Sequence, residues 1–186
     1  MERRSFLLGV TGFFLTAALP VTGSANTGNG GGQRSLVEVF SFTCPHCFKL
    51  SAQMQAWASM HGNVKHFAVH IVSSKDDLKL AAAGYAAAVL GKGEEFRQAF
   101  FAAIHEKQQA ADERTMVSVA EALGFNSLNF VETMRSEKVA ELCARSETIT
   151  KNFQITATPT LIIDMQRVRL PDRDPLEILT EEFGQA

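Results

Sequence analysis

The segment Cys44-Pro45-His46-Cys47 constrains this chain more than any other part of its sequence. It follows the apolar stretch Leu36–Phe42, which predicts a strand, and it opens an amphipathic stretch that predicts a helix ending near His61. Two cysteines three positions apart on the first turn of a helix can bring their sulfurs within disulfide-bonding distance. The segment therefore predicts a strand–turn–helix unit that carries a redox-active cysteine pair.

The two cysteines are expected to play different parts. Cys44 lies at the predicted helix start, where free backbone N–H groups and the helix dipole stabilise a thiolate, so we expect a lowered pKa and a nucleophilic role. Cys47 lies one turn further in and is expected to be more buried and to resolve the mixed disulfide. The alternative is half of a zinc site, but the sequence has no second Cys-x-x-Cys or His-x3-His to complete it, so we expect no metal.

The rest of the chain predicts an α/β fold. A second strand, Val64–Val72, completes a strand–helix–strand unit with a parallel pair. Helical patterns then fill residues 75–136, and a long helix is expected over residues 137–152. The apolar strand Leu161–Asp164, a hairpin partner over residues 166–170 and a helix begun by Asp174-Pro175 follow.

Two further positions bear on the chemistry. Thr158-Pro159 precedes the predicted strand at Leu161, and a proline at the start of a buried strand is unusual. We therefore predict that the Thr158–Pro159 peptide is cis. A cis peptide would turn the Thr158 backbone toward the sulfurs, where it could pair with an extended substrate. An ordinary trans proline in a loop is the alternative. Glu38 shares a strand face with Phe40 and Phe42, which predicts an inward carboxylate; a surface glutamate at a sheet edge is the alternative.

Residues 1–25 have the pattern of a secretory signal: Arg3-Arg4, an apolar run of 14 residues and a small-residue end at Ala25. That run is shorter than the roughly 20 residues of a spanning helix, although a retained anchor is the alternative, and the twin-arginine and general export routes both stay open. A flexible tail is expected over residues 26–35. Cys143 is the third cysteine and has no partner in the Cys-x-x-Cys pair; we expect it to be buried as a small hydrophobe, with a regulatory or dimerising thiol as the alternative. The net charge of −2 does not indicate a protein that binds nucleic acid.

Taken together, Cys-Pro-His-Cys after Glu-Val-Phe-Ser-Phe, a helical block and a later Thr-Pro resemble the DsbA family of the thioredoxin superfamily. The resemblance implies a thioredoxin-like fold over residues 36–73 and 137–186 with an inserted helical domain over 74–136. It implies a monomeric periplasmic dithiol oxidase, without cofactor, that oxidises reduced exported proteins and is reoxidised by a DsbB-type quinone-linked membrane protein. It also implies that Pro45 and His46 tune the redox potential, that Glu38 moves protons for Cys47, and that Thr158 and Pro159 shape the substrate surface.

The sequence departs from the family pattern at several positions. Only glycine-rich sequence precedes Leu36, where the family has a further strand, and Lys65 is one residue out of register for the family's lysine partner of Glu38. Thr158 stands where the general oxidase usually has valine. A disulfide reductase or isomerase and a redox-silent peptide-binding module therefore remain alternatives.

Overall fold

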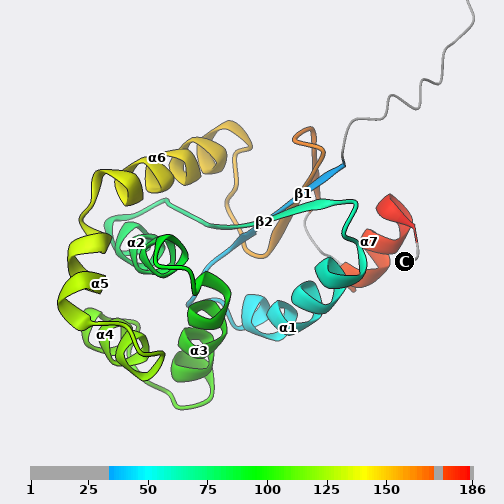
Figure 1. Ribbon diagram of the computed structural model, residues 1–186. Helices are drawn as coiled ribbons and strands as arrows, with labels where there is room; N and C mark the ends of the chain where they lie inside the picture. Colours follow the sequence, from blue (N-terminus) through cyan, green and yellow to red (C-terminus); the bar gives the residue numbers. More distant parts are fainter. Residues whose placement is uncertain (1–33, 170–173, 185–186) are drawn as a thin grey trace, which may run out of the picture. The chain divides into compact units, whose positions relative to one another are not determined.

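Residues 34–169 and 174–184 are described by the computed structural model, and they form the predicted α/β fold (Figure 1). The sheet has the order β2-β1-β3-β4, with β1 (Ser35–Phe40), β2 (Lys65–His70), β3 (Thr160–Ile163) and β4 (Arg167–Arg169). Strand β1 is parallel to β2 and antiparallel to β3, and β3 forms a hairpin with β4. The predicted strand–helix–strand unit is therefore confirmed.

The helices fall where the hydrophobic periodicity places them. They are α1 (Pro45–Met60), α2 (Lys75–Val89), α3 (Gly93–His105), α4 (Glu113–Ala122), α5 (Ser127–Met134), α6 (Glu137–Asn152) and α7 (Pro175–Phe183). Polar side chains cap several of their N-termini by accepting backbone N–H groups, as expected of Asp112, Asn126 and Asp174. None of the helices among the described residues is long and apolar enough to cross a bilayer.

Alternation along β1 sends its side chains to two different cores. Leu36 packs with Leu50 and Met54 of α1 and with Leu179 of α7. Val37 and its neighbour Val39 pack instead against the face that α6 covers, beside Ile149 and Phe153. The sheet thus lies between α1 and α7 on one side and α6 on the other, with the start of α1 at the end of β1 (Figure 1).

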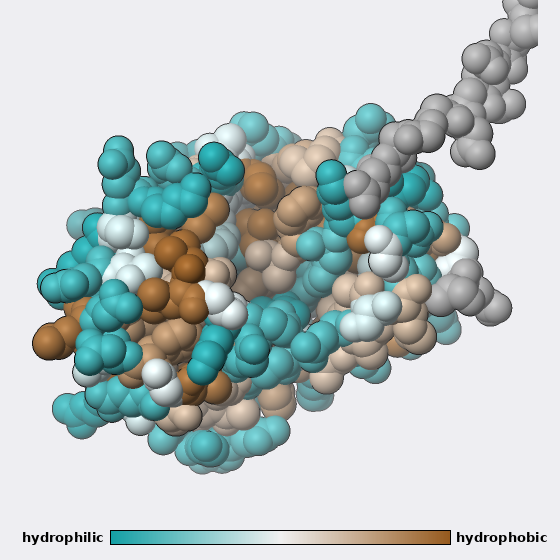
Figure 2. Space-filling model, in the orientation of Figure 1, coloured by the Kyte–Doolittle hydropathy of each residue, from teal (hydrophilic) through white to brown (hydrophobic). Residues whose placement is uncertain are grey.

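Helices α2 to α5 occupy the stretch between β2 and α6, where the inserted domain is predicted, and their core joins that of the sheet through phenylalanine rings. The ring of Phe42, two residues after β1, lies 4.9 Å from the ring of Phe100 on α3, and both side chains are fully buried. Figure 2 shows apolar side chains gathered in a hollow on this block. A groove of about 500 Å³ between α2, α5 and α6 is lined by residues such as Leu78, Val131 and Cys143. The boundaries at 74 and 136 stay a prediction, and the predicted signal and most of the tail lie outside the described residues.

Candidate active site

The first turn of α1 places Cys44 at the helix N-cap. Its backbone is extended, with φ −86° and ψ 115°, and its Sγ accepts the N–H of Cys47 at 3.4 Å. Pro45 follows at the first helical position, where the missing N–H has no partner to lose. Cys44 is partly exposed, Pro45 and His46 are exposed, and Cys47 is fully buried. The expected difference in burial between the two cysteines is confirmed.

The surroundings shift the two thiols in opposite directions. Burial alone would raise the pKa of the Cys44 thiol, but hydrogen bonds with Thr158 and with the backbone of Cys47 and His46 outweigh it, so this pKa lies below its ordinary value. Burial strongly raises the pKa of Cys47, and the adjacent Cys44 adds to the effect. One helical turn thus holds one sulfur that favours the thiolate and one that favours the thiol.

The loop before β3 closes over Cys44. The Thr158–Pro159 peptide is cis, as predicted, and the Cys44 thiol donates to the Thr158 carbonyl at 3.2 Å. Both Thr158 and Pro159 are partly exposed beside the cysteine. Sequence segments 114 residues apart therefore meet at the sulfur. Cys44, Pro45, His46, Thr158 and Pro159 form an accessible surface that we call the mouth of the site.

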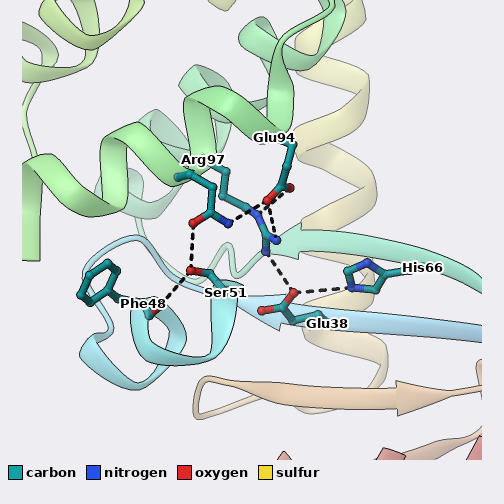
Figure 3. A network of polar contacts seen from close by, with 7 residues as sticks. Glu38, Phe48, Ser51, His66, Glu94 and Arg97 are labelled. Carbon is teal, nitrogen blue, oxygen red and sulfur yellow. Dashed lines mark hydrogen bonds and ion pairs between the residues drawn. The ribbon is translucent and has the colours of Figure 1, made fainter. Parts of the chain in front are cut away.

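Glu38 is fully buried on β1, the strand that leads to the cysteines, so the predicted inward orientation is confirmed. Its Oε2 accepts Arg97 Nη1 at 3.0 Å and lies 3.5 Å from His66 Nε2 (Figure 3). Its Oε1 is buried without a hydrogen-bond partner among the described residues, an arrangement that ordinarily costs about 1–3 kcal/mol. Lys65, one residue before His66, is exposed, and the polar partners of this carboxylate among the described residues are Arg97 and His66.

Arg97 comes from α3, in the helical block, and is held by two carboxylates. Its Nε and Nη2 donate to Glu94 at 3.0 and 3.1 Å, while Nη1 donates to Glu38. Burial alone would lower the pKa of Arg97. The charges and hydrogen bonds of Glu38 and Glu94 outweigh this effect and raise the pKa above its ordinary value, so the guanidinium stays charged. The network continues to α1 through Gln98, which binds Glu94 and accepts from Ser51, one turn after Cys47 (Figure 3).

Two histidines hold the backbone that leads into the site. The N–H of Phe42 donates to His70 Nε2 at 3.2 Å, and the Phe42 carbonyl pairs with His105 Nε2 at 2.9 Å. The His105 ring also stacks on Phe48, the residue after Cys47, at 5.1 Å. Burial lowers the pKa of His70 to about 4, so this side chain is neutral near pH 7. The turn into Cys44 is thereby fixed from both β2 and α3.

No sequence motif marked these histidines or Arg97 as functional residues. The structure brings the predicted residues Cys44, Cys47 and Thr158 together, and it groups Glu38 with Arg97 and His66. Cys143 is buried on α6 as a free thiol, as expected of a small hydrophobe, and burial raises its pKa to about 11.

Known proteins with the same architecture are thiol–disulfide enzymes. Residues 22–178 match the thioredoxin family model. A curated relative, the thiol:disulfide interchange protein DsbA of Burkholderia cepacia, is 27% identical over 134 residues, which cover 71% of this chain and 63% of that protein's length. The crystal structure of DsbA from Xylella fastidiosa superposes with a TM-score of 0.71 at 25% identity, covering 76% of this chain and 78% of the other.

A further solved structure shows a related protein with a peptide bound. DsbA of Proteus mirabilis, in complex with a non-covalently bound peptide, has a TM-score of 0.61 and 24% identity. The similarity covers 69% of this chain and 72% of that one.

Proposed function

The chain is a DsbA-like member of the thioredoxin family, and we propose that it is an exported dithiol oxidase that donates a Cys44–Cys47 disulfide to reduced exported proteins. The observation that carries the proposal is the opposite shift of two thiol pKa values within one helical turn. A sulfur that is stable as a thiolate is a good leaving group, so a disulfide that contains it is readily passed on.

The transfer proceeds by two thiolate attacks. A substrate thiolate attacks Cys44 Sγ, the Cys44–Cys47 bond breaks, and Cys47 leaves with the electron pair and takes a proton. A second substrate thiolate then attacks the substrate sulfur of the mixed disulfide, and Cys44 leaves as the thiolate. The substrate loses two electrons and gains a disulfide, and the enzyme ends as the dithiol. Because the raised pKa of the buried Cys47 makes its thiolate a poor leaving group, the first step depends on the proton that Cys47 takes as it leaves.

The mouth binds the substrate chain in this proposal. In the dithiol form the Thr158 carbonyl accepts the Cys44 thiol. Once Cys44 is in a mixed disulfide it has no proton to donate, so this carbonyl becomes free to accept an N–H from an extended substrate. The peptide bound to the Proteus mirabilis relative is in keeping with such a surface. Pro45 and His46 tune the potential from the exposed turn between the sulfurs.

Glu38 serves Cys47 from below as proton donor and acceptor. Cys47 must gain a proton when it leaves and lose it again when the enzyme is reoxidised, and Glu38 is a fully buried carboxylate on the strand that leads to the site. Reoxidation would require an electron acceptor outside the chain, and we propose a DsbB-type quinone-linked membrane protein. The signal-like residues 1–25 support a periplasmic location and export before function.

The direct test measures disulfide formation in a reduced, unfolded test protein, by counting its remaining thiols over time with the oxidised enzyme. Wild type and Cys143→Ser should oxidise it, whereas Cys44→Ser and Cys47→Ser, neither of which can form the disulfide that is donated, should be inactive. Unchanged oxidation by Cys44→Ser would refute the mechanism. Faster reduction of insulin than oxidation of the test protein would favour the reductase or isomerase, and absence of exchange in wild type would favour a peptide-binding module.

A further inference from the structure

Glu38 presents its two oxygens to different surroundings. Oε2 faces Arg97 and His66, whereas Oε1 has no hydrogen-bond partner among the described residues. In Figure 3 the unpaired oxygen points toward α1, the helix that begins at the cysteine pair. Cys47 packs in the same core cluster as Phe40, which projects from the same face of β1 as Glu38. The carboxylate therefore has one oxygen on the side of the reacting helix and one on the side of β2.

His66 connects that second oxygen to solvent. Its side chain is 15% exposed, compared with 0% for Glu38 and 5% for Arg97, while its Nε2 is buried, without a hydrogen bond, and directed at Oε2 from 3.5 Å. A histidine changes charge between about pH 5 and 8, unlike an arginine. Among the groups that touch Glu38, His66 is thus the one able to take a proton from water and release it again.

The charged groups near His66 come from two elements. Strand β1 contributes Glu38, and α3 contributes Arg97 and Glu94. Glu38 and Arg97 are buried and form an ion pair, whereas the Glu94 side chain is 37% exposed, so solvent screens its charge. His70 of β2 also lies near this cluster, because it lines a cavity of about 190 Å³ together with Arg97 and Glu94. His66 therefore meets a buried carboxylate on its inner side.

We propose that His66 is the residue through which Glu38 exchanges protons with solvent, and that Arg97 is a positioning residue that directs Oε2 to His66 and Oε1 toward the Cys47 helix. The inference rests on the proposed function and deepens it. When Cys47 leaves the disulfide with its electron pair, a water molecule between Oε1 and Sγ passes it a proton from Glu38. His66 restores that proton and recovers its own from bulk water. Reoxidation runs the same transfers in reverse, so protons and electrons balance.

The test is the pH dependence of single-turnover reduction of the oxidised protein by a small thiol, corrected for the thiolate fraction of that thiol. Wild type should show a bend between pH 5 and 8. His66→Gln should be slower and lose the bend, and Glu38→Gln should be slower still, by on the order of 10²-fold. His61→Gln, a buried histidine at the other end of α1, is the matched control and should keep the wild-type profile.

Chemical rescue separates proton exchange from support of the fold. Added imidazole should accelerate His66→Ala at a pH where imidazole carries a proton, and should leave Glu38→Gln and wild type unchanged. A His66→Gln profile that superposes on wild type, or His66→Ala without rescue, overturns the inference. In either case the test protein would still be oxidised, so the proposed function would stand; loss of all exchange in wild type would instead refute that function.

Discussion

The mouth of the site and a buried layer of the protein place the two cysteines of one helical turn in opposite surroundings. At the mouth, Cys44 is partly exposed and its thiolate is favoured by hydrogen bonds. In the buried layer, which we define as Glu38, Cys47 and Arg97, a thiol and an ion pair are excluded from solvent. The mouth is built from local capping geometry, whereas the buried layer depends on a helix that arrives 59 residues later in the chain.

The difference shows what fixes the direction of disulfide transfer. Cysteine chemistry is the same at both positions, so the separation of the two pKa values comes from the surroundings alone. Burial of Cys47 favours its thiol, and hydrogen bonds to Cys44 favour its thiolate. Changes at the mouth should therefore alter reactivity with little effect on stability, and changes in the buried layer should alter stability first.

The largest effect is expected at Arg97. Arg97→Met leaves the buried Glu38 without its cation, and breaking a buried ion pair in this way costs about 3–5 kcal/mol of unfolding free energy. Lys79→Met, which breaks an exposed pair with Asp76, is the matched control and should change little. Urea unfolding measures both.

A second substitution sharpens the same test. Glu38→Gln combined with Arg97→Met removes the stranded charge, so the double variant should be more stable than Arg97→Met alone. Equal destabilisation by Arg97→Met and Lys79→Met would show that the buried layer does not hold the fold.

The next effect is expected at His70, through pH. The unfolded chain binds a proton on this histidine below about pH 6.5, whereas the folded protein does so only near pH 4, so folding stability falls as pH drops through that window. The full loss corresponds to about 3 kcal/mol. His70→Gln can keep the bonds to Phe42 and Ile71 without titrating, and should flatten this dependence; His61→Gln should retain it. An unchanged slope for His70→Gln would contradict the assignment.

The smallest effect is expected at the mouth. Thr158→Val removes a side chain whose hydrogen bond helps to lower the pKa of Cys44, so this pKa should rise while the unfolding free energy hardly changes. Thr156→Val, in the same loop and exposed, is the control. The pKa of Cys44 in each variant follows from the rate of its alkylation as a function of pH. Identical profiles for the two variants would show that the Thr158 side chain does not lower this pKa.

Local patterns predicted the mouth because its determinants are local. A strand followed by Cys-x-x-Cys at a helix start, and a proline before a later strand, each leave a direct mark on the sequence. The alternation of β1 was enough to place Glu38 inward. Only the meeting of Thr158 with Cys44 needed the fold, and the family resemblance supplied it.

The buried layer could not be predicted in the same way. Arg97 lies beside the apolar stripe of α3, and Glu94 three residues earlier makes it resemble half of a surface ion pair. Its burial results from the packing of α3 on the sheet, which no pattern within α3 encodes. No sequence pattern indicated His66 either, because its proposed role in proton exchange depends on the register that pairs β2 with β1. The β3–β4 hairpin was predicted and is confirmed, although Met165 in its turn takes a positive φ of 54° that glycine or asparagine usually supplies.

The most direct test is the titration of Cys44 in a protein that retains no other thiol. Cys47→Ser combined with Cys143→Ala leaves Cys44 alone among the three cysteines, and the ultraviolet absorbance of its thiolate can be followed against pH. We predict a midpoint below that of an ordinary cysteine, about 8.5. A midpoint at or above that value would contradict the claim that this helix start holds a sulfur ready to leave as an anion.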